Sequence, residues 1–138
     1  LIYTSRSGCS LTDDGKKIWK EIERIIPRIS EMECNELTFA KYNIAIHVRN
    51  RGGRVGKGLE QRDAAVRAGA KGAVTLIYEG DRLILPSITR DVARSFPVAY
   101  QQITSLMDLK NNDVVIIVGA DILKDAECGA LAAAWTLI

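Results

Sequence analysis

The stretch Val114-Val115-Ile116-Ile117-Val118 decides the fold, because all five of its consecutive residues are apolar and β-branched. Side chains of a strand point alternately to the two faces of its sheet, so an unbroken apolar run is typical of a strand buried on both faces or central in the sheet. A turn of polar residues, 110–113, precedes the run. We therefore expect the core of the domain to form around residues 114–118.

Further strands and helices are expected on either side of this run. Apolar, β-branched runs predict strands, and apolar residues at helical spacing predict helices. Glu79-Gly80-Asp81 indicates a tight hairpin, and Pro97 lies near an expected helix start. The predicted order is strand 42–48, helix 59–70, strand 73–78, strand 82–85, helix 98–109, strand 114–118 and helix 121–138.

This order predicts an α+β fold. Its first six elements match the split βαβ, ferredoxin-like order, and right-handed crossovers would place the helices on one face of the sheet. We therefore expect a two-layer sandwich with an added C-terminal helix. The last helix ends in the apolar stretch 130–137, which either the rest of the domain or a second subunit must cover.

The N-terminal residues predict a small hairpin that leads into a helix. Residues 1–4 are apolar and β-prone, residues 5–8 favour a turn, and residues 9–11 could return as a second strand. Thr12 can cap a helix over 13–26, whose isoleucines form one apolar face. A hairpin with a capped helix is also found in many unrelated domains.

We interpret the hairpin and helix as the C-terminal part of a winged-helix DNA-binding domain. In this interpretation residues 1–29 hold the wing and its following helix, with Arg6 at the wing tip. The acidic, mixed segment 30–41 is then a linker, and residues 42–138 form a second, α+β domain for sensing or dimerisation.

Composition narrows the function classes. The chain has 138 residues, 47% of them hydrophobic, and a net charge of only +2, which does not favour a strongly basic nucleic-acid binder. One histidine and three widely spaced cysteines offer no zinc-ligand pattern, so we expect no metal, no cofactor and reduced cysteines. The chain opens with no leader pattern and has no long apolar span, and we expect a cytoplasmic protein.

The segment 49–58 has the most unusual composition, with four basic residues, four glycines and no acid. It joins a predicted strand to a helix start, where freed backbone N–H groups and the helix dipole can bind an anion. Its spacing matches neither a P-loop nor a dinucleotide fingerprint. A small anionic ligand, a nucleic-acid backbone and a solvated flexible loop all remain open. The candidate ligand-binding residues are Arg49, Arg51, Gly53, Arg54, Lys57, Gln61 and Arg62.

Other polar residues point to no catalytic site. His47 lies in an alternating apolar strand and has no evident nucleophile beside it, so we interpret it as a satisfied, half-buried histidine. The cluster 89–94 is expected at the end of the sheet opposite the Gly/Arg segment, near 119–121, where Asp121 would cap the last helix. We find no catalytic residues and predict that the protein is not an enzyme.

Two longer stretches carry a family resemblance. Residues 58–76, which include the run Glu60-Gln61-Arg62-Asp63, and residues 113–138 resemble an archaeal family of winged-helix proteins whose C-terminal domain has no known function. The resemblance implies a transcriptional regulator in which an N-terminal winged helix binds DNA and the C-terminal domain senses or dimerises. This chain departs from that pattern because it holds no helix-turn-helix.

We therefore expect the C-terminal regulatory or dimerisation part of a DNA-binding regulator, a homodimer that senses a small anionic effector. DNA would be bound through the parent winged-helix domain and only weakly by this chain. The alternative is a separate module that binds phosphates or carboxylates or, less favoured, an enzyme that acts on them.

Overall fold

The computed structural model describes residues 24–138 in full and, as backbone only, two N-terminal strands. These strands, β1 (Ile2–Ser5) and β2 (Gly8–Leu11), pair in antiparallel register with Ile2 opposite Leu11. The predicted hairpin is thereby confirmed. Arg6 and residues 12–23 of the predicted first helix lie outside the described residues.

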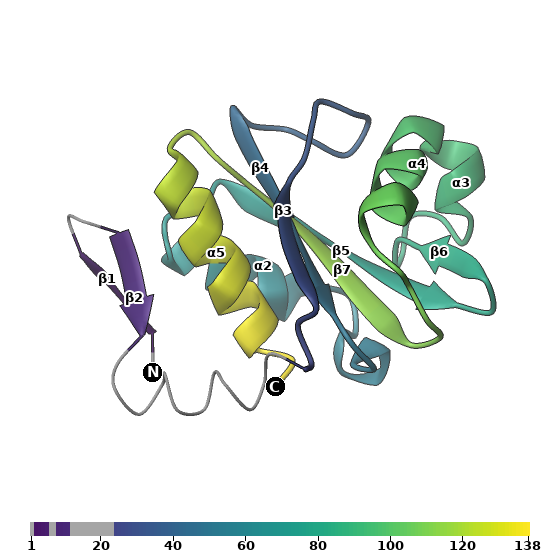
Figure 1. The fold of residues 1–138 in the computed structure, drawn as a ribbon, viewed down its shortest axis with the longest axis horizontal. Coiled ribbons are helices and arrows are strands. Elements are labelled where there is room, and N and C mark those ends of the chain that lie inside the picture. The colour runs from purple at the N-terminus through teal and green to yellow at the C-terminus, as the bar shows by residue number, and fades with distance from the viewer. Residues whose placement is uncertain (1, 6–7, 12–23) are drawn as a thin grey trace.

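A five-stranded antiparallel sheet forms the centre of the molecule (Figure 1). Its spatial order is β3-β4-β7-β5-β6. All eight residues of β7 are buried, which confirms the expectation from the apolar run 114–118. The strands are β3 (Arg28–Glu31), β4 (Tyr42–Val48), β5 (Gly72–Glu79), β6 (Arg82–Ile84) and β7 (Asp113–Ala120).

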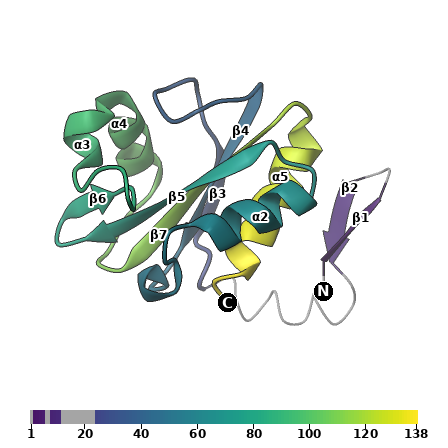
Figure 2. The ribbon, with the colours of Figure 1, turned by 180° about the vertical axis from the view of Figure 1, so that it is seen from behind.

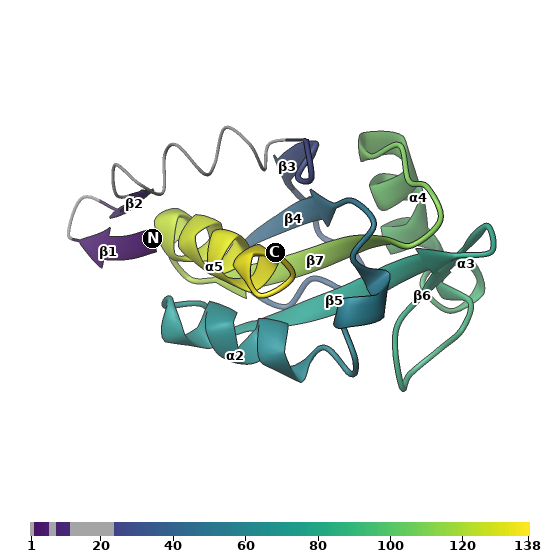
Figure 3. The ribbon, with the colours of Figure 1, turned by 90° about the horizontal axis from the view of Figure 1, so that it is seen from below.

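Helices cover both faces of this sheet (Figure 3). On one face lie α2 (Leu59–Arg67) and α5 (Leu123–Trp135), which are seen from behind in Figure 2. On the other face lie α3 (Val92–Ser95) and α4 (Pro97–Leu106), and Pro97 opens α4 as predicted. A 3-10 turn, η1 (Gly52–Arg54), lies in the loop before α2.

The prediction of a two-layer sandwich with all helices on one face is therefore wrong. The side chains of β7 alternate between two separate cores, with Ile116 packed toward α5 and Ile117 toward α4. Ile46 and Ala45 of β4 divide in the same way. Because both faces of these strands are apolar, each face needs its own covering layer.

The sheet also differs from the predicted ferredoxin-like order, which is not confirmed. The mixed α+β class holds, and from β4 onward the predicted strands and helices follow one another as expected, with α3 added before α4. In space, β7 lies between β4 and β5, and β3 adds an edge strand beside β4 with Ile29 opposite Ile46. The predicted boundary between residues 29 and 30 thus falls within a strand.

The segment 30–41, expected as a linker, is partly built into the domain. Met32 and Leu37 are buried in the core beneath α4. The Glu36 carboxylate accepts hydrogen bonds from the backbone N–H groups of Val98 (3.2 Å) and Ala99 (2.8 Å) in the first turn of α4. Desolvation opposes a charged Glu36, but these hydrogen bonds prevail and lower its pKa. Glu36 therefore acts as a cap for α4 from a distant part of the sequence.

The apolar end of α5 is covered by the domain itself. Ala130, Ala133, Ala134 and Leu137 are all fully buried within this chain. The two options left open by the sequence are thereby resolved in favour of cover by the same domain. This stretch gives no support for a second subunit.

The cysteines differ from the sequence expectation. Cys34 is free and exposed, but Cys128 on α5 is disulfide-bonded, so the expectation of three reduced cysteines is wrong. Among the described residues, no helix is long and apolar enough to cross a membrane.

Gly129 of α5 allows the closest approach between this helix and its neighbours. A Cβ atom there would lie 2.8 Å from Val118 Cγ1 and 2.9 Å from Ala70 Cβ, closer than carbon atoms pack. We predict that Gly129→Val lowers the free energy of unfolding by about 1–3 kcal/mol through overpacking. Denaturant unfolding measures this, with Gly53→Val as control because a Cβ at Gly53 meets nothing within 4 Å. Equal losses of unfolding free energy in the two variants would contradict the assignment of Gly129 to a closely packed helix contact.

Candidate functional site

The Gly/Arg loop, residues 49–58, connects β4 to α2 and is fixed at its start by the turn before β7. The backbone N–H of Asn50 donates to Asp113 Oδ1 (3.0 Å), and that of Gly52 donates to the Asn112 carbonyl (2.9 Å). The side chains of Asn50 and Asn112 are joined by a 2.8 Å hydrogen bond. Both asparagines have positive φ, a conformation that Asn tolerates better than most residues. The loop is therefore held in a defined shape.

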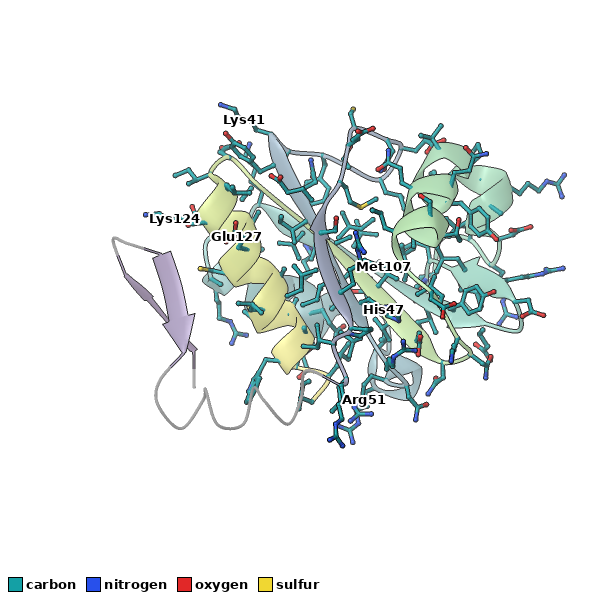
Figure 4. The ribbon with its side chains drawn as sticks, viewed as in Figure 1. Lys41, His47, Arg51, Met107, Lys124 and Glu127 are labelled. Atoms are coloured by element: carbon teal, nitrogen blue, oxygen red, sulfur yellow. The ribbon has the colours of Figure 1, made fainter. Side chains whose placement is uncertain are left out.

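A buried histidine–aspartate pair lies beneath the loop. His47 Nε2 is 2.8 Å from Asp113 Oδ2, and the side chains are 2% and 3% exposed. The same oxygen accepts the Lys110 N–H at 3.0 Å and lies 3.7 Å from Arg49 Nη1. Figure 4 shows His47 within the sheet and Arg51 at the loop below it. The interpretation of His47 as satisfied agrees with this pairing, but the residue is fully rather than half buried.

Burial affects the protonation of His47. Desolvation lowers the pKa of His47 below its ordinary value, and the hydrogen bond that the imidazole donates to Asp113 opposes that shift only in part. The imidazole is therefore neutral near neutral pH. Because both side chains are closed off from solvent, neither can reach a substrate, and the pair serves to position the loop.

The structure separates the predicted ligand-binding residues into two groups. Gly53 and Lys57 are exposed on the loop, and Arg49 and Arg51 are partly exposed there. The other three are Arg54, which lies on the loop but is hydrogen-bonded to residues 137 and 138, and Gln61 and Arg62, which lie on α2.

Each of these three has a different environment. Arg54 Nη1 donates to the carbonyls of Leu137 (3.3 Å) and Ile138 (2.7 Å), just beyond α5. Gln61 is fully buried and donates through Nε2 to Thr136 Oγ1 at 3.0 Å. Arg62 is exposed on α2 rather than on the loop. Gln61 thus lies in the interior, where a ligand on the loop surface cannot reach it.

Arg51 stands out among the loop cations. Its Nε is shielded from solvent and has no hydrogen-bond partner in the structure, while its Nη1 donates to the Asn50 carbonyl at 3.2 Å. No described acidic side chain forms an ion pair with Arg51 or Lys57. Buried polar groups are nearly always paired, so the Nε of Arg51 is an exception, as are Gln61 Oε1 and Thr75 Oγ1.

The cluster that begins at Thr89 lies beside the Gly/Arg loop, not at the opposite end of the sheet as predicted. Thr89, Arg90 and Gly56 line one open groove of about 410 Å³. Asp121 does not cap α5, whose N-cap is Ile122; it forms a 3.0 Å ion pair with Lys71 instead. The sequence missed this groove because the expected topology placed its two walls apart.

Within the described residues there is no group of three or more His, Cys, Asp or Glu side chains that could hold a metal ion. The charged side chains of the Gly/Arg loop itself are three guanidinium groups and one ammonium group. Such groups bind anions without proton transfer.

The comparisons with known proteins define the family. Residues 39–137, most of the chain, match the family described as a domain of unknown function (DUF4443), and the chain belongs to that family. No match was found among curated proteins.

A solved structure is also similar, a hypothetical protein from Pyrococcus horikoshii OT3. It has a TM-score of 0.69 and 26% sequence identity over 94% of this chain. The match covers 65% of that protein's chain, so the present chain spans about two thirds of its length. An archaeal relative agrees with the resemblance noted from the sequence. Neither comparison identifies a winged-helix regulator.

His47 is the only histidine of the chain, so it dominates titration near pH 6. Its lowered pKa in the folded state means that the unfolded chain binds a proton more readily there. The contribution of His47 to the free energy of unfolding should be fully present above the pKa of the unfolded chain, about 6.5. It should be lost progressively as the pH falls below that value. We predict that His47→Gln, which can still donate to Asp113, flattens this slope.

Denaturant unfolding of both proteins between about pH 5.5 and 7.5 provides the measurement, a range above the ordinary carboxylate pKa values. An equal dependence of stability on pH in the two proteins would show that a group other than His47 causes it.

Proposed function

We propose that this domain is the sensing half of a DNA-binding regulator and that it binds a small anionic effector on the Gly/Arg loop. The observation that carries the sensing part is the shielded, unpartnered Nε of Arg51 on a loop that Asp113 holds in place. A preformed cationic loop loses little conformational entropy when it binds.

The loop residues available to a ligand are Arg51, Lys57 and, in part, Arg49. Arg49 is already 3.7 Å from Asp113, so its charge is partly compensated. Arg51 and Lys57 have no such compensation among the described residues. A phosphate or carboxylate on the loop would place acceptor oxygens beside both and could form bidentate hydrogen bonds with Arg51.

Binding is favoured over catalysis at this site. All four charged residues of the loop are cations, which stabilise negative charge on a bound ligand. The only histidine is buried against Asp113. A catalytic base would have to come from elsewhere in the chain.

The regulator part of the proposal depends on other observations. It is supported by the resemblance of residues 58–76 and 113–138 and by the N-terminal hairpin β1–β2, whose form suits a wing. A net charge of +2 does not favour strong DNA binding by this chain, so in this proposal the parent protein binds DNA through its winged helix.

We predict that an anionic metabolite stabilises the wild-type protein against heat and that Arg51→Ala abolishes the effect. Inorganic phosphate, nucleotides and dicarboxylates serve as probes in a thermal-shift assay at constant ionic strength. A ligand at a hundredfold excess over its Kd adds about 2.7 kcal/mol.

The matched control is Arg62→Ala, which removes the same charge from an exposed position on α2. Loss of the effect in both variants would indicate a general charge effect. A flat response of the wild-type protein to every probe would refute sensing at the loop.

A second prediction concerns assembly. A regulator that reads paired DNA half-sites needs paired recognition elements, so we expect the protein to be a homodimer. Sedimentation equilibrium at increasing protein concentration measures this. A strict monomer at the highest concentration would remove dimerisation from the proposal and leave effector binding untouched.

A further inference from the structure

We propose that the groove between the Gly/Arg loop and the turn 85–90 binds an apolar α-amino acid. This site is separate from the anion site on the loop and does not depend on it. The groove has a volume of about 410 Å³, within the range of roughly 300–1,000 Å³ that is usual for small-ligand sites. Four features of its lining define the ligand, and they are an apolar floor, an apolar wall, one cation and one carboxylate.

The floor of the groove is apolar sheet surface. Ile77 of β5 and Ile84 of β6 are opposite one another in register, so their side chains lie on the same face. Ile77 packs at the margin of the core under α2 and α5, which places this face on the side of those helices. Figures 2 and 3 show that neither helix extends over β6. The two isoleucines are therefore only partly buried.

The turn 85–90 forms an apolar wall beside this floor. Leu85 and Thr89 close the turn through reciprocal backbone hydrogen bonds of 2.9 and 3.0 Å. Ser87 has a φ of +67°, an uncommon conformation for serine. At the tip, Ile88 is 69% exposed, the most exposed of the large apolar side chains described. Strain of this kind is retained mainly where a turn has a use, such as a ligand wall.

One charge of each sign lines the groove. Arg90 and Glu79 are both exposed, both border the groove, and neither forms an ion pair among the described residues. Arg82 is opposite Glu79 in the hairpin register, yet the two side chains do not come within ion-pair distance. The groove therefore offers a free guanidinium and a free carboxylate above an apolar floor.

These features complement a ligand that carries a carboxylate, an ammonium group and an apolar side chain. Arg90 would bind the carboxylate, for which its planar guanidinium is suited, and Glu79 would accept from the ammonium group. The apolar side chain would cover Ile77 and Ile84. A simple monocarboxylate would leave Glu79 unpaired near a second negative charge, so a ligand with both charges is favoured.

The test is isothermal titration of the whole chain with L-leucine and L-phenylalanine at pH 7. Two analogues of leucine separate the charges: 4-methylpentanoate lacks the ammonium group and 3-methylbutylamine lacks the carboxylate. We expect at least one of the amino acids to bind and both analogues to bind more than about tenfold more weakly. Arg90→Ala and Glu79→Gln should each weaken amino-acid binding to a similar extent.

The matched control is Arg94→Ala, which removes the same charge from an exposed position on α3 that does not line the groove. A second control is Arg51→Ala, which should leave amino-acid binding unchanged while it abolishes anion binding on the loop. The two proposals can thus fail separately.

Three results would overturn the inference. They are no binding of either amino acid to the wild-type chain, equal affinity for 4-methylpentanoate and leucine, and an equal loss in Arg94→Ala and Arg90→Ala. Glu79, Arg90 and Arg94 are exposed and Arg51 is partly exposed. Circular dichroism of each variant shows whether its fold is unchanged.

Discussion

The buried carboxylate of Asp113 is the interaction on which the arrangement of the loop depends. It lies at the first residue of the central strand and accepts hydrogen bonds from His47 and from the backbone of Asn50 and Lys110. A buried carboxylate is costly unless its oxygens are paired, and hydrogen bonds to a charged group contribute about 1.5–3 kcal/mol each. One side chain therefore joins the sheet, the turn before β7 and the Gly/Arg loop.

This joining explains why a segment with four glycines can hold a defined shape. Glycine adds conformational freedom to the unfolded chain, so an unsupported Gly-rich loop would not be fixed. Here Asp113 and Asn112 hold the start of the loop, and Arg54 holds its middle against the carbonyls that follow α5. Of the four basic residues, Arg54 is committed to structure, and Arg51 and Lys57 remain available for a ligand.

The sequence predicted the parts of the fold that follow from local pattern. The run 114–118, the hairpin around Gly80 and the helix start at Pro97 each have a signal within a few residues. It did not predict β3, because Arg28–Glu31 is short and polar and becomes a strand only by pairing with β4. The sequence also did not predict the second helical layer. Ala45 and Ile46 are adjacent apolar residues on opposite faces of the same strand, a pattern that indicates two covered faces. From the sequence, Asp113 is predicted only as a turn residue, because its partners His47 and Asn50 are more than sixty positions away.

The same contacts bear on how a ligand at the loop could act on the N-terminal hairpin. A ligand shifts a protein between two arrangements only if it binds them with different affinity. Arg54 connects the loop to the residues after α5, and α5 in turn lies beside β2 of the N-terminal hairpin (Figure 1). A ligand that bound Arg51 and shifted the loop would also have to move Arg54 or break its hydrogen bonds to Leu137 and Ile138. Helix α5 is thus the element through which occupancy of the loop would reach the hairpin, because coupling between two sites is carried by packed elements that both sites can bias.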